Sequence, residues 1–303
     1  MLRPFAEIVA GHRAALAWLA TLGVASPRFE AALDDLEALD GILRGHGGRM
    51  SLRQALPTIQ ESRDLQHVHQ AFRDRSEPAL VDVLKKAADG PEAGEPEPST
   101  GRTGRNFMAE LTWAAILEGT GHPVRFGGEA DAVLPLPYAE AESIVWEVKR
   151  PHGKGPDGVL RDAGRQLRKR ATKPQLGTTP IGGFPVVFLD RLLAGQAPAN
   201  LYEKDLREPE FLRHDLSAWV KQHRKTIRRR CDKAGVLGAV FYWRPVVVCW
   251  DQNDGTPTFL DCSQLFVDLT VGVSIPNGHR AYVHRLLNGL RRNPPSEAKL
   301  TWG

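Results

Sequence analysis

Apolar residues recur at helical spacing over the first third of the chain. Leu33, Leu36, Leu39 and Leu43 follow one another at intervals of three or four positions, and similar spacing continues towards residue 88. No strand-like run of β-branched residues interrupts residues 5–88. The pattern therefore predicts an all-helical N-terminal domain over residues 1–88, with an amphipathic first helix favoured over a cleaved leader.

The pattern changes after this helical stretch. Residues 89–104 are rich in Pro, Gly and Glu and contain no large apolar residue, which is typical of a linker. Beyond the linker, helical and strand-like patterns alternate. Helices are expected at 105–118, 158–170, 211–233 and 279–292, and strands at 124–126, 131–136, 142–150, 184–190 and, broken near Pro245, within 236–250. The alternation predicts an α/β domain over 105–303, with a mixed central sheet flanked by helices.

Composition and charge narrow the class of protein. With 42% hydrophobic and 25% charged residues the chain is globular in type, and it has no apolar run of the roughly 18 residues needed to cross a bilayer. Its three scattered cysteines favour neither a disulfide framework nor zinc, so a cytoplasmic location is expected. Basic residues outnumber acidic ones only after residue 100, which favours a polyanionic partner for that part. Phosphate-binding-loop and nucleophile-elbow motifs are absent from the sequence.

One predicted strand carries an unusual pair of charges. Side chains alternate along a strand, so Glu147 and Lys149 share one face, whereas Trp146 and Val148 share the other. An acid and an amine on a largely apolar strand are costly to bury unless each has a partner. A divalent ion could pair with the carboxylate, and the lysine could stand beside a nucleophilic water.

Two further carboxylates precede this strand. Glu110 falls among the apolar positions of the helix at 105–118, where an inward carboxylate needs a cation or donors; a half-exposed position at the edge of the apolar stripe is the alternative. Asp131 follows a Gly-Gly-Glu-Ala turn and could be only a turn residue. If both converge on Glu147, the three carboxylates would suit Mg²⁺ or Mn²⁺; a salt-bridge cluster is the structural alternative.

The order Glu110, Asp131, Glu147-Val148-Lys149 resembles the PD-(D/E)XK nuclease superfamily, which has the restriction-endonuclease-like fold. The resemblance covers residues 101–190. It implies metal ligation by Asp131, Glu147 and the backbone carbonyl of Val148, with Glu110 supporting a metal directly or through water. It also implies that Lys149 orients the attacking water or stabilises developing charge.

Two positions qualify this resemblance. The family often carries a glutamine on the following helix, and Gln166 matches that position, on the inward side of the helix at 158–170. Ala130 replaces the proline that names the motif, which leaves Glu129 as a rival to Asp131 for the role of ligand.

Basic residues gather on the outward faces of two predicted helices. Such faces can follow a nucleic-acid backbone, although a solvated helix face is the alternative. The candidate phosphate-binding residues are Arg150, Arg161, Arg165, Arg168, Arg224 and Arg228, with Lys169 and Arg170 expected alongside on the outward face of the first helix.

These patterns together predict a metal-dependent nuclease that hydrolyses phosphodiester bonds with Mg²⁺ or Mn²⁺ as cofactor. DNA is the expected partner, a homodimer is an expected assembly, and no membrane association is expected. The alternative is a catalytically silent module of the same fold that binds nucleic acid or protein.

Overall fold

The computed structural model describes residues 2–46, 52–91, 104–151, 155–190, 201–202, 210–250, 257–261, 264–269, 272 and 275–292. The helices are α1 (Phe5–Thr21), α2 (Pro27–Leu43), α3 (Leu52–Phe72), α4 (Pro78–Ala88), α5 (Gly104–Gly119), α6 (Asp157–Arg170), α8 (Glu210–Cys231) and α9 (Asn277–Arg292). The strands are β1 (Leu2–Pro4), β2 (Ala132–Leu136), β3 (Ala139–Lys149), β4 (Thr179–Phe188), β5 (Leu201–Tyr202), β6 (Ala239–Trp243), β7 (Val246–Trp250), β8 (Pro257–Asp261) and β9 (Gln264–Asp268).

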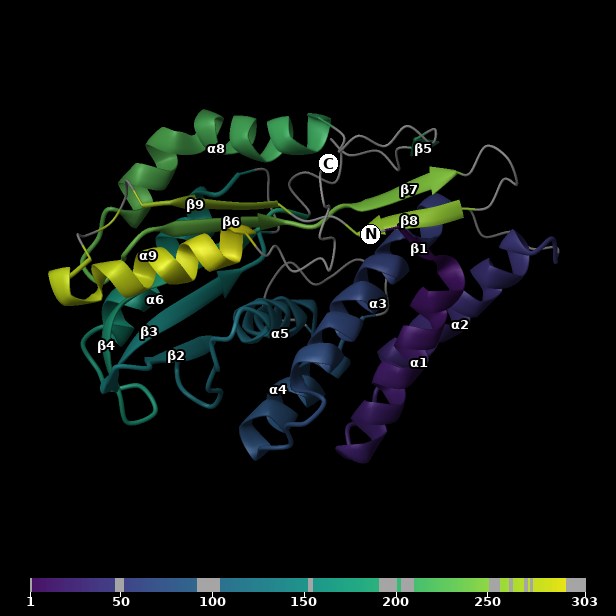
Figure 1. The fold of residues 1–303 in the computed structure, drawn as a ribbon, viewed down its shortest axis with the longest axis horizontal. Coiled ribbons are helices and arrows are strands. Elements are labelled where there is room, and N and C mark those ends of the chain that lie inside the picture. The colour runs from purple at the N-terminus through teal and green to yellow at the C-terminus, as the bar shows by residue number, and fades with distance from the viewer. Residues whose placement is uncertain are drawn as a thin grey trace.

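A mixed five-stranded sheet forms the centre of the α/β part, in the order β2-β3-β4-β6-β9. Strands β3, β4 and β6 run parallel, and β2 and β9 close the two edges in antiparallel pairing. Helices flank this sheet on both faces (Figure 1). The predicted α/β class with a mixed central sheet is therefore confirmed.

The two faces of the sheet follow from the alternation of side chains along β3. On one face Trp146 packs against Trp113 of α5, with 5.3 Å between ring centroids, and stacks on Phe184 of β4 at 4.9 Å. On the other face Val145 packs in a second buried cluster, together with residues of α6 and α8. The strand that carries the candidate site is thus covered on both sides.

A second sheet, in the order β1-β8-β7-β5, lies beside the first (Figure 1). The chain passes from β6 in one sheet to β7 in the other through Arg244 and Pro245, which confirms the predicted break. Proline has no amide hydrogen to donate to a strand ladder, so the strand cannot continue unchanged through Pro245. The N-terminal strand β1 completes this sheet by pairing Leu2 with Leu260 of β8.

The helical N-terminal part packs directly on the α/β part. Leu65 of α3 and Leu84 of α4 belong to the same buried cluster as Trp113 and Trp146, and α5 lies between these helices and the five-stranded sheet (Figure 1). One hydrophobic core therefore crosses the boundary drawn from the sequence. Residues 92–103 of the expected linker lie outside the described residues, and the division into domains stays a prediction.

Two glycines let β4 approach its neighbours. A Cβ on Gly183 would stand 2.3 Å from the carbonyl oxygen of Val145 on β3. Gly182 has a φ of +141°, a backbone angle that residues other than glycine rarely adopt. Both lie where the β3–β4 register shifts, next to Ser143 and Ile144. A Cβ on Gly183 would also stand 2.6 Å from Leu167 of α6, so this glycine lets α6 pack closely on the sheet.

Candidate active site

Asp131 and Glu147 are brought together by the register of β2 and β3. Ala132 pairs with Trp146, so the preceding Asp131 stands beside Glu147 across the antiparallel pair. Asp131 Oδ2 accepts a hydrogen bond of 2.8 Å from the backbone amide of Val148. Both carboxylates are buried. Because a backbone amide holds Asp131, its position follows from the strand pairing.

Lys149 joins the two carboxylates. Its Nζ lies 3.1 Å from Glu147 Oε2 and 3.6 Å from Asp131 Oδ2. The lysine side chain is 17% exposed, whereas Glu147 is fully buried. Three of the predicted groups thus meet at one place, where the ammonium group lies nearest to solvent.

Arg170, at the end of α6, forms a further ion pair with Glu147. The prediction that Arg170 lies on the outward face of this helix is wrong, because its side chain is buried. Leu160, Ala163 and Leu167 form the inward stripe of α6, and a step of three positions from Leu167 reaches Arg170. The same helical spacing could have identified this partner, and a buried carboxylate such as Glu147 requires one.

Gln166 lies one turn before Arg170 on α6 and is half-buried. Its Oε1 atom is buried and has no hydrogen-bond partner within the part of the chain that the structure describes. An unpaired buried acceptor costs about 1–3 kcal/mol, so a donor at this position would be stabilising. The residue that the family resemblance implicated therefore has an unmet acceptor.

Glu110 and Glu129 occupy different surroundings. Glu110 is buried on α5, the helix whose Trp113 packs on the Trp146 face of the sheet. Glu129 is exposed, whereas Asp131 is buried against Lys149. Across the described ranges, no group of three His, Cys, Asp or Glu side chains is arranged to hold a metal ion. The structure brings Asp131 and Glu147 together at Lys149 and buries Glu110 on α5.

Five exposed arginines of α6 and α8 form what we call the basic α6–α8 surface: Arg161, Arg165, Arg168, Arg224 and Arg228. The two helices pack against each other, and Asp157 of α6 accepts hydrogen bonds of 2.6 Å from Arg230 and 2.7 Å from Arg229 of α8. These hydrogen bonds lower the pKa of Asp157 to about 2, and the bond from Arg230 contributes most to this shift. An ionic contact therefore joins α6 to α8 at one end of this surface.

Arg150 is separate from that surface. It follows Lys149 at the end of β3, is largely buried, and donates from Nε to Asp190 Oδ2 at 2.7 Å. Its surroundings are those of a cavity lined by several arginines. A phosphate in that cavity would lie within reach of Arg150.

No family model matches this chain, and neither the curated proteins nor the solved structures contain a significant match. Within the described ranges, the helices are too short or too polar to cross a bilayer. The function must therefore be argued from the residues and their geometry.

Proposed function

We propose that this protein is a metal-dependent nuclease of the PD-(D/E)XK type with a restriction-endonuclease-like fold, acting on DNA. The observation that carries the proposal is the meeting of Asp131 and Glu147 at Lys149, on adjacent strands of a mixed sheet. Two buried carboxylates beside one partly exposed ammonium group match the chemistry that hydrolysis of a phosphodiester requires.

The donor set fits Mg²⁺ or Mn²⁺. Carboxylate and carbonyl oxygens are the ligands that these cations prefer, and the set would comprise Asp131, Glu147 and the backbone carbonyl of Val148. The bound ion would activate water and neutralise charge on the phosphate. Glu110, which is buried on α5, would support the ion directly or through water.

The remaining residues have separate tasks in this proposal. The ammonium group of Lys149 stabilises negative charge near the carboxylates and needs little reorganisation to do so, since Glu147 and Asp131 already hold it in place. Gln166 would use its open Oε1 acceptor to orient a water molecule. The basic α6–α8 surface would follow the phosphate backbone and make binding salt-dependent.

A cleavage assay with matched variants tests the proposal. Single- and double-stranded DNA and RNA would be incubated with Mg²⁺, Mn²⁺ or EDTA. We expect Glu147→Gln and Lys149→Ala to slow cleavage by at least about 100-fold, which is the scale for loss of one charge-stabilising group. Glu140→Gln is the control, because Glu140 is an exposed acid on the same strand. Circular dichroism would verify that each variant is folded.

If Glu147→Gln and Lys149→Ala cut as fast as the Glu140→Gln control, the site is misassigned. If wild-type protein cuts nothing under any of these conditions, the catalytic proposal fails as a whole.

A catalytically silent nucleic-acid-binding module is the second candidate, and one observation favours it. Arg170 and Lys149 already neutralise Glu147 without any metal, so the acidic cluster could be purely structural. This candidate predicts unchanged DNA binding in EDTA together with no cleavage in Mg²⁺ or Mn²⁺. Metal-dependent cleavage by wild-type protein that Glu147→Gln abolishes would exclude it.

A further inference from the structure

One aromatic side chain is exposed at the turn between β2 and β3. Tyr138 is 49% exposed, and among the residues that the structure describes it is the only large apolar side chain left open to solvent. A single exposed aromatic residue is ordinary in a folded protein. This tyrosine differs from an ordinary surface residue because its neighbours hold the ring in place and bring positive charge beside it.

Two aromatic side chains of α9 fix the ring of Tyr138. The imidazole of His279 stacks on it, with 5.9 Å between ring centroids, and His279 Nδ1 lies 2.9 Å from the phenol oxygen. Tyr282 meets the same ring edge to face at 5.4 Å. A ring that is already fixed loses little conformational freedom when a ligand packs on it, so the entropic cost of binding there is small.

These two α9 side chains are themselves anchored to other elements. His279 Nε2 lies 3.4 Å from Glu142 Oε2 on β3. The phenol oxygen of Tyr282 lies 3.0 Å from Nδ1 of His122, in the segment after α5. The packing of α9 accounts for Tyr282, which is buried, but it does not require a ring that is open to solvent at Tyr138.

Helix α9 is strongly basic. Its sequence contains Arg280, Arg285, Arg291 and Arg292 and no acidic residue. The side chains of Arg280, His284 and Arg285 are exposed. A concentration of positive charge on one exposed helix attracts polyanions.

Arg285 lies close to the exposed ring. Burial, together with the carboxylate of Glu142, raises the pKa of the Tyr138 phenol, and the positive charge of Arg285 opposes this shift. Burial also raises the pKa of Tyr282 to about 12, and Arg285 again opposes the shift. A guanidinium group therefore lies within electrostatic range of both phenols, beside a flat aromatic surface that solvent can reach.

We propose that Tyr138 is a stacking platform for one unpaired nucleobase of a single-stranded nucleic acid, whose flanking phosphates contact Arg285 and Arg280. The base supplies a flat face that stacks on the ring, and the phosphates supply the negative charge that α9 attracts. In a duplex the neighbouring base pairs cover that face, so only an unpaired nucleotide fits. The inference rests on the proposed function for its biological meaning, and it deepens that function by naming an unpaired strand as the partner.

The platform is remote from Glu147 and Lys149. Tyr138 directly precedes the first residue of β3, and Lys149 is the last residue of that strand. At about 3.3 Å per residue, Tyr138 and Glu147 are separated by about 30 Å. Binding at the platform can therefore be measured apart from cleavage.

Fluorescence anisotropy of labelled oligonucleotides, with the full chain in EDTA, tests the proposal. EDTA prevents metal-dependent cleavage, so failure of the platform is distinguishable from failure of the nuclease. One strand is measured alone and as a duplex with its complement, over a series of salt concentrations. We expect Tyr138→Leu to weaken binding of the single strand about tenfold, because it removes the stacking surface, and to leave binding of the duplex unchanged.

Further variants separate stacking from charge. Tyr138→Phe should retain most of the single-strand affinity, because it keeps the ring. Arg285→Gln should lower the slope of log affinity against log salt by about 0.7, the value for one phosphate contact on a single strand, whereas Tyr138→Leu should leave that slope unchanged. Arg13→Gln is the control, since Arg13 pairs with Glu37 in an exposed position. Thermal melting would verify that all variants are folded.

A loss of single-strand affinity in Tyr138→Leu that Tyr138→Phe does not share supports the platform, even if the protein cuts no nucleic acid. Equal single-strand affinities of wild type and Tyr138→Leu would overturn it. Equal losses for the single strand and the duplex would overturn it too, because the ring would then not select unpaired bases. A wild-type protein that binds no single strand at low salt would have the same consequence.

Discussion

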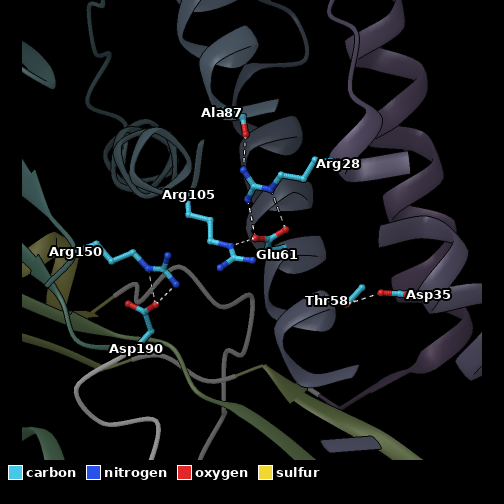
Figure 2. Close-up of polar contacts among 8 residues, drawn as sticks. All are labelled: Arg28, Asp35, Thr58, Glu61, Ala87, Arg105, Arg150 and Asp190. Atoms are coloured by element: carbon cyan, nitrogen blue, oxygen red, sulfur yellow. Dashed lines mark hydrogen bonds and ion pairs between the residues drawn. The ribbon is translucent and has the colours of Figure 1, made fainter. Parts of the chain in front are cut away.

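Two charged clusters lie near the end of β3, and they are built in different ways. In the carboxylate cluster, Glu147 is shared by two cations, Lys149 and Arg170. In the arginine cluster, the single carboxylate of Glu61 is shared by Arg28 and Arg105. In both clusters an acid is the shared group, but in the second it is shared between two cations that come from different helices. The first cluster lies within one sheet and its covering helix, and the second joins three helices of the chain (Figure 2).

The largest effect should follow from breaking the arginine cluster. Arg28 is almost fully buried, pairs with Glu61 and donates to the carbonyl of Ala87 at 2.7 Å. Arg28→Met should lower the free energy of unfolding by about 3–5 kcal/mol, because it removes one partner of a buried pair. Urea unfolding followed by circular dichroism measures this loss. Arg13→Gln is the control, because Arg13 pairs with Glu37 in an exposed position, and it should cost about 0–1 kcal/mol. A loss below 1 kcal/mol for Arg28→Met would show that this contact is not structural.

A smaller effect is expected in the carboxylate cluster, because Lys149 stays beside Glu147 when Arg170 is removed. Arg170→Met should cost about 1–3 kcal/mol. Mg²⁺ should raise the melting temperature of this variant more than that of wild type, since a ligand that binds only the folded state stabilises it and the guanidinium no longer competes. Melting curves with and without Mg²⁺ measure the difference. If Mg²⁺ shifts neither protein, these carboxylates do not bind the ion.

The smallest effect concerns the contact between α6 and α8. The folded-state pKa of Asp157 is lowered from 3.8 to about 2, chiefly by the hydrogen bond from Arg230. A lowered pKa adds stability above the unfolded value, and this stability is lost as the pH falls from about 4 to about 2. Asp157→Asn should therefore show a shallower loss of stability over this range than wild type in urea titrations. Identical pH profiles would mean that the ionic contact does not stabilise the fold.

The carboxylate cluster was largely predictable, because local rules place its members. Alternation along one strand put Glu147 and Lys149 on the same face, and an adjoining strand start supplied Asp131. Glu110 was correctly expected to be buried on its helix. Arg170 was placed on the wrong side of α6, although its spacing from Leu167 pointed inward.

The arginine cluster was not predictable in the same way. Arg28, Glu61 and Arg105 come from α2, α3 and α5, and no local periodicity relates them. Only the packing of three helices brings them together. For the fold, long buried strands such as β3 and β4 were visible in the sequence, whereas β1, β5, β8 and β9 were not, since they are short and lack a distinctive pattern.

The pairing of β1 with β8 has a consequence for the order in which the chain can fold. The backbone groups of Leu2–Pro4 must wait for a partner strand near position 260 before they are satisfied. During synthesis the second sheet therefore stays incomplete until β8 has emerged from the ribosome, more than 250 residues after β1. Such distant pairing slows folding, so we expect the four-stranded sheet to be the last part of the molecule to assemble.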